Sequence, residues 1–205
     1  MKKILLFFVF LPQIFLAQNI TYDKTSPIMV QGLTKQTRLI GTDLKNVSSL
    51  KDKFKIAMSI SASQEEDEDT TLYSLFIRLY TPIECHIERN SRILLKSEED
   101  SITVLYAEAP ASSTYEIDYN GKYTTHYYQT YISYNITEEQ ANYLQYGIKK
   151  IKIECSIPDN ISKEWKSDKK GLGLYLYDQY KLIKARLNAT NKENKKQNDS
   201  FLKDF

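Results

Sequence analysis

The chain has 205 residues, including 28 basic and 26 acidic side chains, a length that suits one domain with a sizeable core. Residues 1–17 contain two lysines and no acid, so the remainder carries 26 charges of each sign. Phosphate binding needs a cationic excess on one face, so this balance argues against a nucleic-acid partner. With 6 glycines and 5 prolines, collagen-like and proline-rich classes are excluded.

The N-terminus has the pattern of a secretory signal peptide. Two lysines form a basic start, residues 4–16 form an apolar run, and Ala17 offers a small residue for cleavage. An uncleaved anchor is the alternative, but a spanning helix needs roughly 20 apolar residues, and this run is shorter and contains Pro12. We therefore expect cleavage of residues 1–17, no stable membrane span in the mature protein, and export to the periplasm, the cell surface or the medium.

The first half of the mature chain predicts strands. Residues 18–50 are weakly patterned, with one strand expected over 37–40 and turn signals at Ser26-Pro27, Gly32 and Gly41. Apolar and polar side chains then alternate over 54–61, which is typical of a half-buried strand. A second strand is predicted over 71–80, and we expect the two to form a hairpin around the acidic loop at 64–70.

The middle of the chain contains further strands. Short ones are predicted over 83–87, 91–97 and 101–106. The strongest local signal is Asn120-Gly121, because both central residues of a two-residue type I′ hairpin turn need positive φ. We expect this turn to join strands over 115–119 and 122–136.

Two helices are predicted in the last third. Thr137 and Gln140 fit a capping box at the start of the first helix, and Gly147 should end it before a strand over 148–157. The second helix is expected over about 170–188. It has an apolar stripe that comprises Leu172, Leu176, Tyr180, Ile183 and Leu187. The polar residues 191–205 are expected to form a flexible tail.

This order of elements predicts a mainly β, α+β fold. Many short strands with two late helices indicate an antiparallel β-sandwich or curved sheet, with a short capped helix as a crossover and a C-terminal helix packed against the sheet. We expect residues 18–190 to form this single domain. The pattern predicts that the sheet exists, but it leaves the order of the strands open.

Two segments resemble a known kind of protein. Residues 91–105 (SRILLKSEEDSITVL) place an acidic turn between two strands, and residues 134–154 (YNITEEQANYLQYGIKKIKIE) lead from a capped helix into a strand. In these segments the chain resembles small exported β-rich proteins of Gram-negative bacteria that have no assigned activity. The resemblance implies a periplasmic or cell-surface setting, and it transfers no catalytic residue.

The two cysteines leave two interpretations open. Cys85 and Cys155 each alternate with isoleucines on a predicted strand, so both should point to the apolar side. An oxidising compartment permits a disulfide between them. The alternative is two separate buried thiols that act as small hydrophobic side chains. No basic surroundings are evident that would activate either thiol for catalysis.

Metal and cofactor signals are weak. Glu84, His86 and Glu88 alternate on one face of a predicted strand, and such side chains can converge on a zinc ion. The same strip is equally what a solvated strand face presents. No cofactor motif is found in the sequence, so we expect no cofactor.

A tyrosine-rich hairpin is the main candidate for ligand binding. If 122–136 is one strand, then Tyr123, Tyr127 and Tyr131 share a face with hydroxyl and amide side chains. Such a face could stack on sugar rings or anchor a protein partner, because tyrosine offers a large ring with a polar tip. Tyrosines also pair across ordinary strands. The opposite face, expected to be the core side, comprises His126, Tyr128, Ile132, Tyr134 and Ile136.

These features favour an exported, non-enzymatic structural or binding module with a protein or glycan partner. One alternative is a periplasmic inhibitor or immunity-type protein that acts through the acidic loop at 64–70. A hydrolase is a further alternative, but nucleophilic catalysis needs a base beside the nucleophile. The two histidines lie in no motif of that kind.

Overall fold

The computed structural model describes residues 20–30, 33–47, 54–65, 70–119, 121–156, 160–168 and 171–203. The predicted signal peptide at 1–17, residues 66–69 of the acidic loop and Asn120 lie outside this part of the chain.

Most of the described strands form one antiparallel sheet, which confirms the predicted mainly β fold. Its order is β1 (Ile20–Val30), β2 (Leu33–Thr42), β4 (Lys55–Glu65), β5 (Thr71–Thr81), β11 (Thr124–Ile136), β8 (Ile102–Ala107), β7 (Arg92–Lys96), β12 (Lys150–Ile153) and β13 (Ile161–Glu164). In addition, β10 (Thr114–Tyr119) pairs with β11, and β3 (Lys45–Asn46) pairs with β4. A separate small sheet joins β6 (His86–Ile87) to β9 (Ala111–Ser112).

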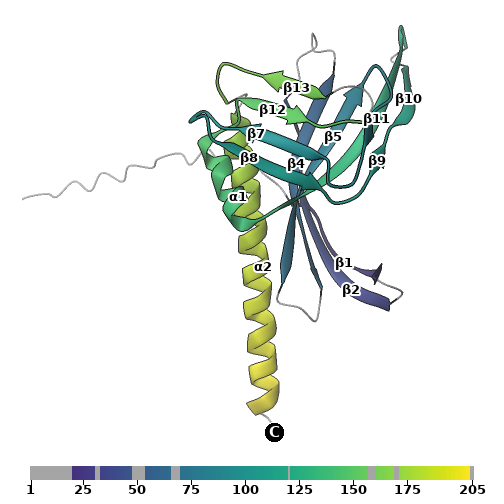
Figure 1. The fold of residues 1–205 in the computed structure, drawn as a ribbon. Coiled ribbons are helices and arrows are strands. Elements are labelled where there is room, and N and C mark those ends of the chain that lie inside the picture. The colour runs from purple at the N-terminus through teal and green to yellow at the C-terminus, as the bar shows by residue number, and fades with distance from the viewer. Residues whose placement is uncertain are drawn as a thin grey trace, which may run out of the picture.

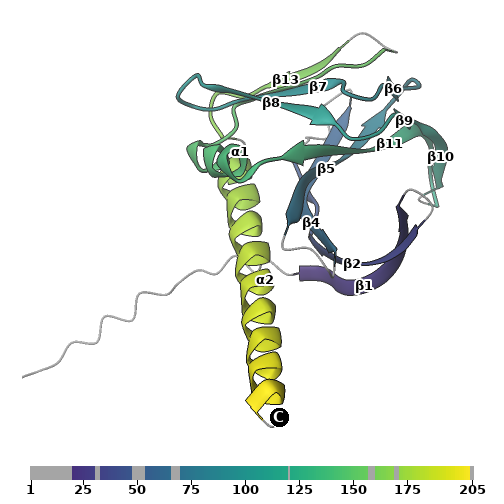
Figure 2. The same ribbon diagram turned by 60° about the horizontal axis from the view of Figure 1, so that its bottom comes forward.

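The large sheet is strongly curved. Its β7, β8, β12 and β13 strands lie across one end of β4 and β5, with the long C-terminal helix on one side of the molecule (Figures 1 and 2). The β1–β2 and β10–β11 hairpins curve toward the other side, although the first part of β1 stays in contact with the helix through Asp23 and Arg186. The sheet therefore has a core side, which is covered by the helix and the crossing strands, and a second side that the two hairpins flank.

Strand alternation builds the core. On β5, Leu75, Ile77 and Leu79 are fully buried, whereas the side chains between them are half-buried. The predicted hairpin of β4 and β5 is confirmed, with Met58 opposite Ile77. The apolar interior continues through the other strands, including Ile93, Leu95, Leu105, Ile132, Tyr134, Ile151 and Ile153.

The crossover from β11 to β12 is the predicted capped helix. In α1 (Glu138–Tyr143), the backbone N–H of Gln140 donates to the Thr137 hydroxyl, and the backbone N–H of Thr137 donates to the Gln140 side chain. A 3-10 turn (Leu144–Tyr146) follows, and Gly147 at φ 78° ends it. This positive φ favours glycine, so the crossover begins and ends as predicted.

The second helix, α2 (Leu172–Lys203), packs the predicted stripe into the core, and all five residues of the stripe are buried. The helix is longer than predicted, because it continues past Asn188 as far as Lys203 and so includes most of the segment predicted as a flexible tail, whose flexibility stays a prediction. That segment contains no glycine or proline to stop a helix and is rich in lysine. It projects beyond the sheet (Figures 1 and 2).

The N-terminal part of the described chain forms a hairpin where only one short strand was predicted. The single strand expected at 37–40 is part of β2, which pairs along its length with β1. Two of the predicted turn signals, Pro27 and Gly41, lie inside these strands. Proline is tolerated there because β1 is an edge strand.

The predicted hairpin turn is found at Gly121, but the connection between its two strands is longer than predicted. The last pair between β10 and β11 joins Tyr119 to Thr124, so the connection has four residues instead of two. Gly121 has the positive φ that the turn prediction required. Because the register moves by two residues, each β11 side chain keeps its predicted face.

Candidate binding site on the open face of the sheet

The side of β4, β5 and β11 opposite the core carries an aromatic and charged surface, which we call the open face. On β5 it comprises Phe76, Arg78 and Tyr80, the half-buried residues between the core positions. Strand pairing places Tyr131 of β11 opposite Arg78, and Lys55 of β4 opposite Tyr80. The open face is therefore built by three neighbouring strands of the central sheet.

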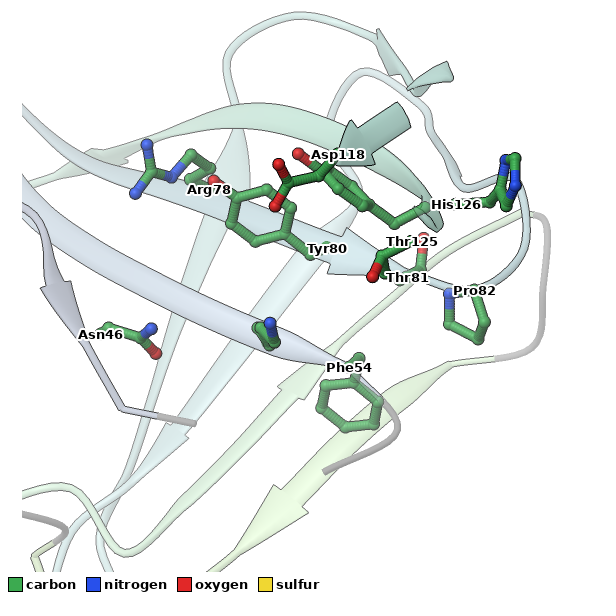
Figure 3. Close-up of a pocket in the computed structure, with 11 residues that line it drawn as sticks. Asn46, Phe54, Arg78, Tyr80, Thr81, Pro82, Asp118, Thr125 and His126 are labelled. Atoms are coloured by element: carbon green, nitrogen blue, oxygen red, sulfur yellow. The ribbon is translucent and has the colours of Figure 1, made fainter. Parts of the chain in front are cut away.

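A pocket of about 420 Å³ lies at one end of the open face. Its wall includes Phe54, Lys55, Arg78, Tyr80, Asp118 and Tyr127. The labelled side chains in Figure 3 come from different elements, with Phe54 directly before β4 and Asp118 on β10. The pocket thus gathers side chains from the neighbouring strands β4, β5, β11 and β10.

Aromatic rings define the shape of the pocket. The rings of Tyr80 and Tyr127 lie edge to face, with centroids 5.3 Å apart and an interplanar angle of 70°. The guanidinium carbon of Arg78 lies 5.3 Å from the centre of the Tyr80 ring. Further along the open face, Tyr131 stacks on Phe76 at 5.8 Å and 23°. These contacts hold the rings in fixed orientations, because each ring is braced by a neighbour on the adjacent strand.

The pocket contains charged side chains that make no ion pair within the described residues. Within the described residues, Lys55, Arg78 and Asp118 form no ion pair, and the buried Nε of Arg78 has no hydrogen-bond partner. By contrast, Arg92 pairs with Glu154 at 2.9 Å outside the pocket. The pocket therefore holds charged groups whose interactions are incomplete in the protein alone.

The environment of Tyr127 reflects these charges. Burial raises the pKa of Tyr127 above its ordinary value, and the Tyr80 hydroxyl and the carboxylates of Asp118 and Glu116 contribute in the same direction. Arg78 acts in the opposite direction. The Tyr127 hydroxyl consequently stays protonated at neutral pH and can donate a hydrogen bond.

A smaller hollow of about 260 Å³ continues the open face toward β1 and β2. Phe76 and Tyr22 are among the residues that line it. The Tyr22 ring lies against Gly41, where an added Cβ would come within 2.2 Å of the ring. Phe76 therefore lies between the two hollows, which together extend along the width of the three strands.

The three predicted tyrosines do not act as one strip. Tyr127 lines the pocket, and Tyr131 lies next to it on the open face. Tyr123 precedes the first residue of β11, is 62% exposed and has the ammonium of Lys122 at 5.3 Å from its ring centre. Its place in the connection, not on the strand, separates it from the pocket.

The predicted core side of β11 is correct for its second half. Ile132, Tyr134 and Ile136 are buried, but His126 is exposed and Tyr128 is half-buried. The first half of β11 extends past the core, so its side chains there have no apolar layer to enter. His126 instead hydrogen-bonds through Nδ1 with the Tyr115 hydroxyl at 2.6 Å, and it is also among the residues that line the pocket (Figure 3).

The candidate metal residues do not converge. His86 Nε2 lies 3.0 Å from the Glu84 carboxylate, and its Nδ1 lies 3.0 Å from the Ser112 hydroxyl. Glu88 is exposed, and its backbone N–H bonds to Ser91. In the part of the chain that the structure describes, no three histidine, cysteine or acidic side chains are grouped to hold a metal ion.

The two cysteines meet in the core as thiols. Their sulfur atoms are 3.7 Å apart, with Cys85 buried and Cys155 half-buried. The hydrogen bond that the Cys85 thiol donates to Cys155, together with burial, raises the pKa of Cys85. The fold thus places side by side two residues that are 70 positions apart in the chain.

Comparison with known proteins provides no assignment for this site. No protein-family model matches the chain, and neither the curated proteins nor the solved structures include a significant match. Among the described helices, none combines the length and apolar character needed to cross a membrane.

Most residues of the pocket were not found by sequence reasoning. The tyrosine pattern led to Tyr127, but Arg78, Tyr80 and Asp118 come from other strands. A usable signal lay in 71–80, where Phe76, Arg78 and Tyr80 alternate with core residues. An arginine between two aromatic residues on one face of a strand is unusual for a solvent-exposed strand face. Such a face would place large aromatic rings next to a positive charge.

Proposed function

We propose that the protein is an exported, non-enzymatic binding module and that its ligand is a glycan held in the pocket of the open face. The observation that carries the proposal is the pair of Tyr80 and Tyr127, whose rings form a fixed corner in a pocket of about 420 Å³. The pattern of residues 1–17 supports the exported setting.

The chemistry of the wall suits a sugar. A pyranose ring has apolar C–H faces that stack on aromatic rings, and its rim carries hydroxyls that need hydrogen-bond partners. Tyr80, Tyr127 and Phe54 supply ring surfaces, and Asp118 supplies a carboxylate that accepts from hydroxyls. The volume lies within the range of small-ligand pockets.

The position of the pocket also favours binding. Arg78 and Tyr80 lie on β5, between β4 and β11, where backbone pairing on both sides fixes the strand. Side chains on paired strands lose little freedom when a ligand arrives, so less of the interaction energy is spent on ordering. This preorganisation supports recognition of a ligand without a closing lid.

A glycan array followed by calorimetry tests the proposal. Replacing Tyr127 by Ala should weaken binding of any glycan found by about tenfold or more, because an aromatic wall of the pocket is lost. Tyr123→Ala is the matched control, since Tyr123 is exposed and does not line the pocket. Both variants should melt close to the wild type.

A silent array would count against the glycan proposal. A large fall in the melting temperature of Tyr127→Ala would mean that the ring serves mainly the core. The inhibitor alternative stays a prediction, because residues 66–69 of its acidic loop lie outside the described chain. Neutralising the acids of that loop should abolish inhibition if that alternative is correct.

A further inference from the structure

We infer that the glycan is an acidic one, whose carboxylate is recognised by Arg78 and Lys55 at the pocket. This inference rests on the proposed function and narrows it to one class of sugar. It is carried by the two positively charged side chains of the pocket wall, for which no ion pair is present within the described residues.

The two cations are placed to act on one group. Arg78 and Tyr80 lie on the same face of β5, and Lys55 is the residue of β4 opposite Tyr80. The two charges therefore lie on adjacent strands, offset by two residues, on the same side of the sheet. Both side chains line the same pocket.

Arg78 in particular has a hydrogen-bond donor that no group in the described protein satisfies. The side chain is half-buried, and its buried Nε donor has no hydrogen-bond partner. A buried donor without a partner costs stability, so the hydrogen-bonding capacity of the Arg78 guanidinium is not fully used by the described protein. A carboxylate on the accessible nitrogens of the guanidinium would add charge-assisted hydrogen bonds that the protein alone does not provide.

The acids near the pocket do not fill this role. Asp118 lines the pocket, and Glu116 lies two residues before it on β10, yet neither forms an ion pair with Arg78 or Lys55 within the described chain. Asp118 is instead free to accept from sugar hydroxyls. The pocket is thus divided between a cationic side on β4 and β5 and an anionic side on β10.

The aromatic corner selects a sugar acid over other anions. A free carboxylate or a phosphate would use Arg78 and Lys55 but has no apolar ring face to stack on the side chains of Tyr80 and Tyr127. A uronic acid combines an apolar ring face, hydroxyls and one carboxylate in a single residue. A peptide with a free C-terminal carboxylate is the competing ligand class, and it enters the test as a separate outcome.

The test compares a galacturonate oligomer with the same oligomer after chemical reduction of its carboxyl groups, by calorimetry at low salt. We expect the acidic oligomer to bind about 10- to 100-fold more tightly, the range typical of hydrogen bonds to a charged group. Arg78→Gln should remove most of this difference, and added salt should reduce it. Lys152→Gln is the control, because Lys152 is an exposed cation on β12.

The outcomes separate the two proposals. Equal affinity for both oligomers would overturn the inference and leave the glycan function standing. Binding of neither, with binding of a peptide that is lost on C-terminal amidation, would overturn both.

If Arg78→Gln does not fold, Arg78→Lys keeps the charge but loses the planar guanidinium. It should then retain the salt dependence with weaker affinity, and unchanged affinity for both oligomers would contradict the role of Arg78.

Discussion

The side-chain oxygen of Gln179 on α2 accepts a hydrogen bond from the backbone N–H of Ile60 on β4 at 3.0 Å. The amide nitrogen of the same side chain donates to the carbonyl of Asp43 at 2.6 Å. The pairing of β2 with β4 ends at Gly41 and Ser61, and Thr42 donates its hydroxyl to the Ile60 carbonyl. Gln179 and Thr42 therefore satisfy the backbone of Ile60 where the neighbouring strand departs.

Replacing Gln179 by Leu should lower the free energy of unfolding by about 1–3 kcal/mol, because the buried N–H of Ile60 loses its partner, whereas the exposed carbonyl of Asp43 keeps the Tyr175 hydroxyl. Urea unfolding measures the change. Asp178→Ala on the same helix is the control, and its effect should stay within about 0.5 kcal/mol because that residue is only partly buried. Equal effects of the two substitutions would show that the Gln179 hydrogen bonds contribute little.

Gly41 and Tyr22 should be energetically coupled. A Cβ at position 41 would lie 2.2 Å from the Tyr22 ring, so Gly41→Ala must displace the ring. We expect Gly41→Ala to destabilise the protein by about 1 kcal/mol or more when Tyr22 is present, and by much less in the Tyr22→Ala background. A double-mutant cycle by thermal unfolding measures this coupling, and simple additivity of the two substitutions would contradict it.

Because of Asp23, the free energy of unfolding should depend on pH in the acid range. Its carboxylate accepts from Arg38 of β2 at 2.8 Å and from Arg186 of α2 at 2.9 Å, and the hydrogen bond from Arg38 is the main cause that lowers the pKa of Asp23 from 3.8 to about 2. A lowered folded-state pKa means that stability is present above pH 4 and is lost as the pH falls toward 2.

The variant Asp23→Asn tests this dependence. Its free energy of unfolding at pH 7 should be about 1 kcal/mol below that of the wild type, a value reduced for solvent screening, and the difference should shrink as the pH falls through about 2 and vanish below it. Unfolding in urea across this pH range is the measurement, with the exposed Glu99→Gln as control. A constant difference at every pH would mean that the substitution acts through packing.

The thiols of Cys85 and Cys155 should form a disulfide in an oxidising compartment. Their sulfurs, now 3.7 Å apart, must approach to about 2.05 Å, and two protons and two electrons pass to a disulfide oxidant. A bridge over a loop of this length contributes roughly 4 kcal/mol in the chain-entropy model. Mass spectrometry of the unreduced, unfolded protein measures the outcome, and two free thiols would contradict it.

The sequence predicted the parts of the fold where one face of an element is apolar. Strand alternation located β4 and β5, and the capping box of Thr137 located α1, because each signal is local. Only residues 37–40 of the β1–β2 hairpin were predicted, since the rest of its strands show no clean alternation. The pocket was missed apart from Tyr127, because strand order decides which residues become neighbours, and no local pattern encodes that order.

Strand β11 carries Ile132 and Tyr134 in the core and Tyr127 at the pocket on one continuous backbone. A ligand bound to Tyr127 therefore contacts a strand that can leave the sheet only if the hydrophobic core unfolds. Such a ligand should stabilise the whole domain. Occupancy at 100 times the dissociation constant would raise global stability by about 2.7 kcal/mol. A thermal-shift screen of sugars can consequently reveal the ligand before any partner has been isolated.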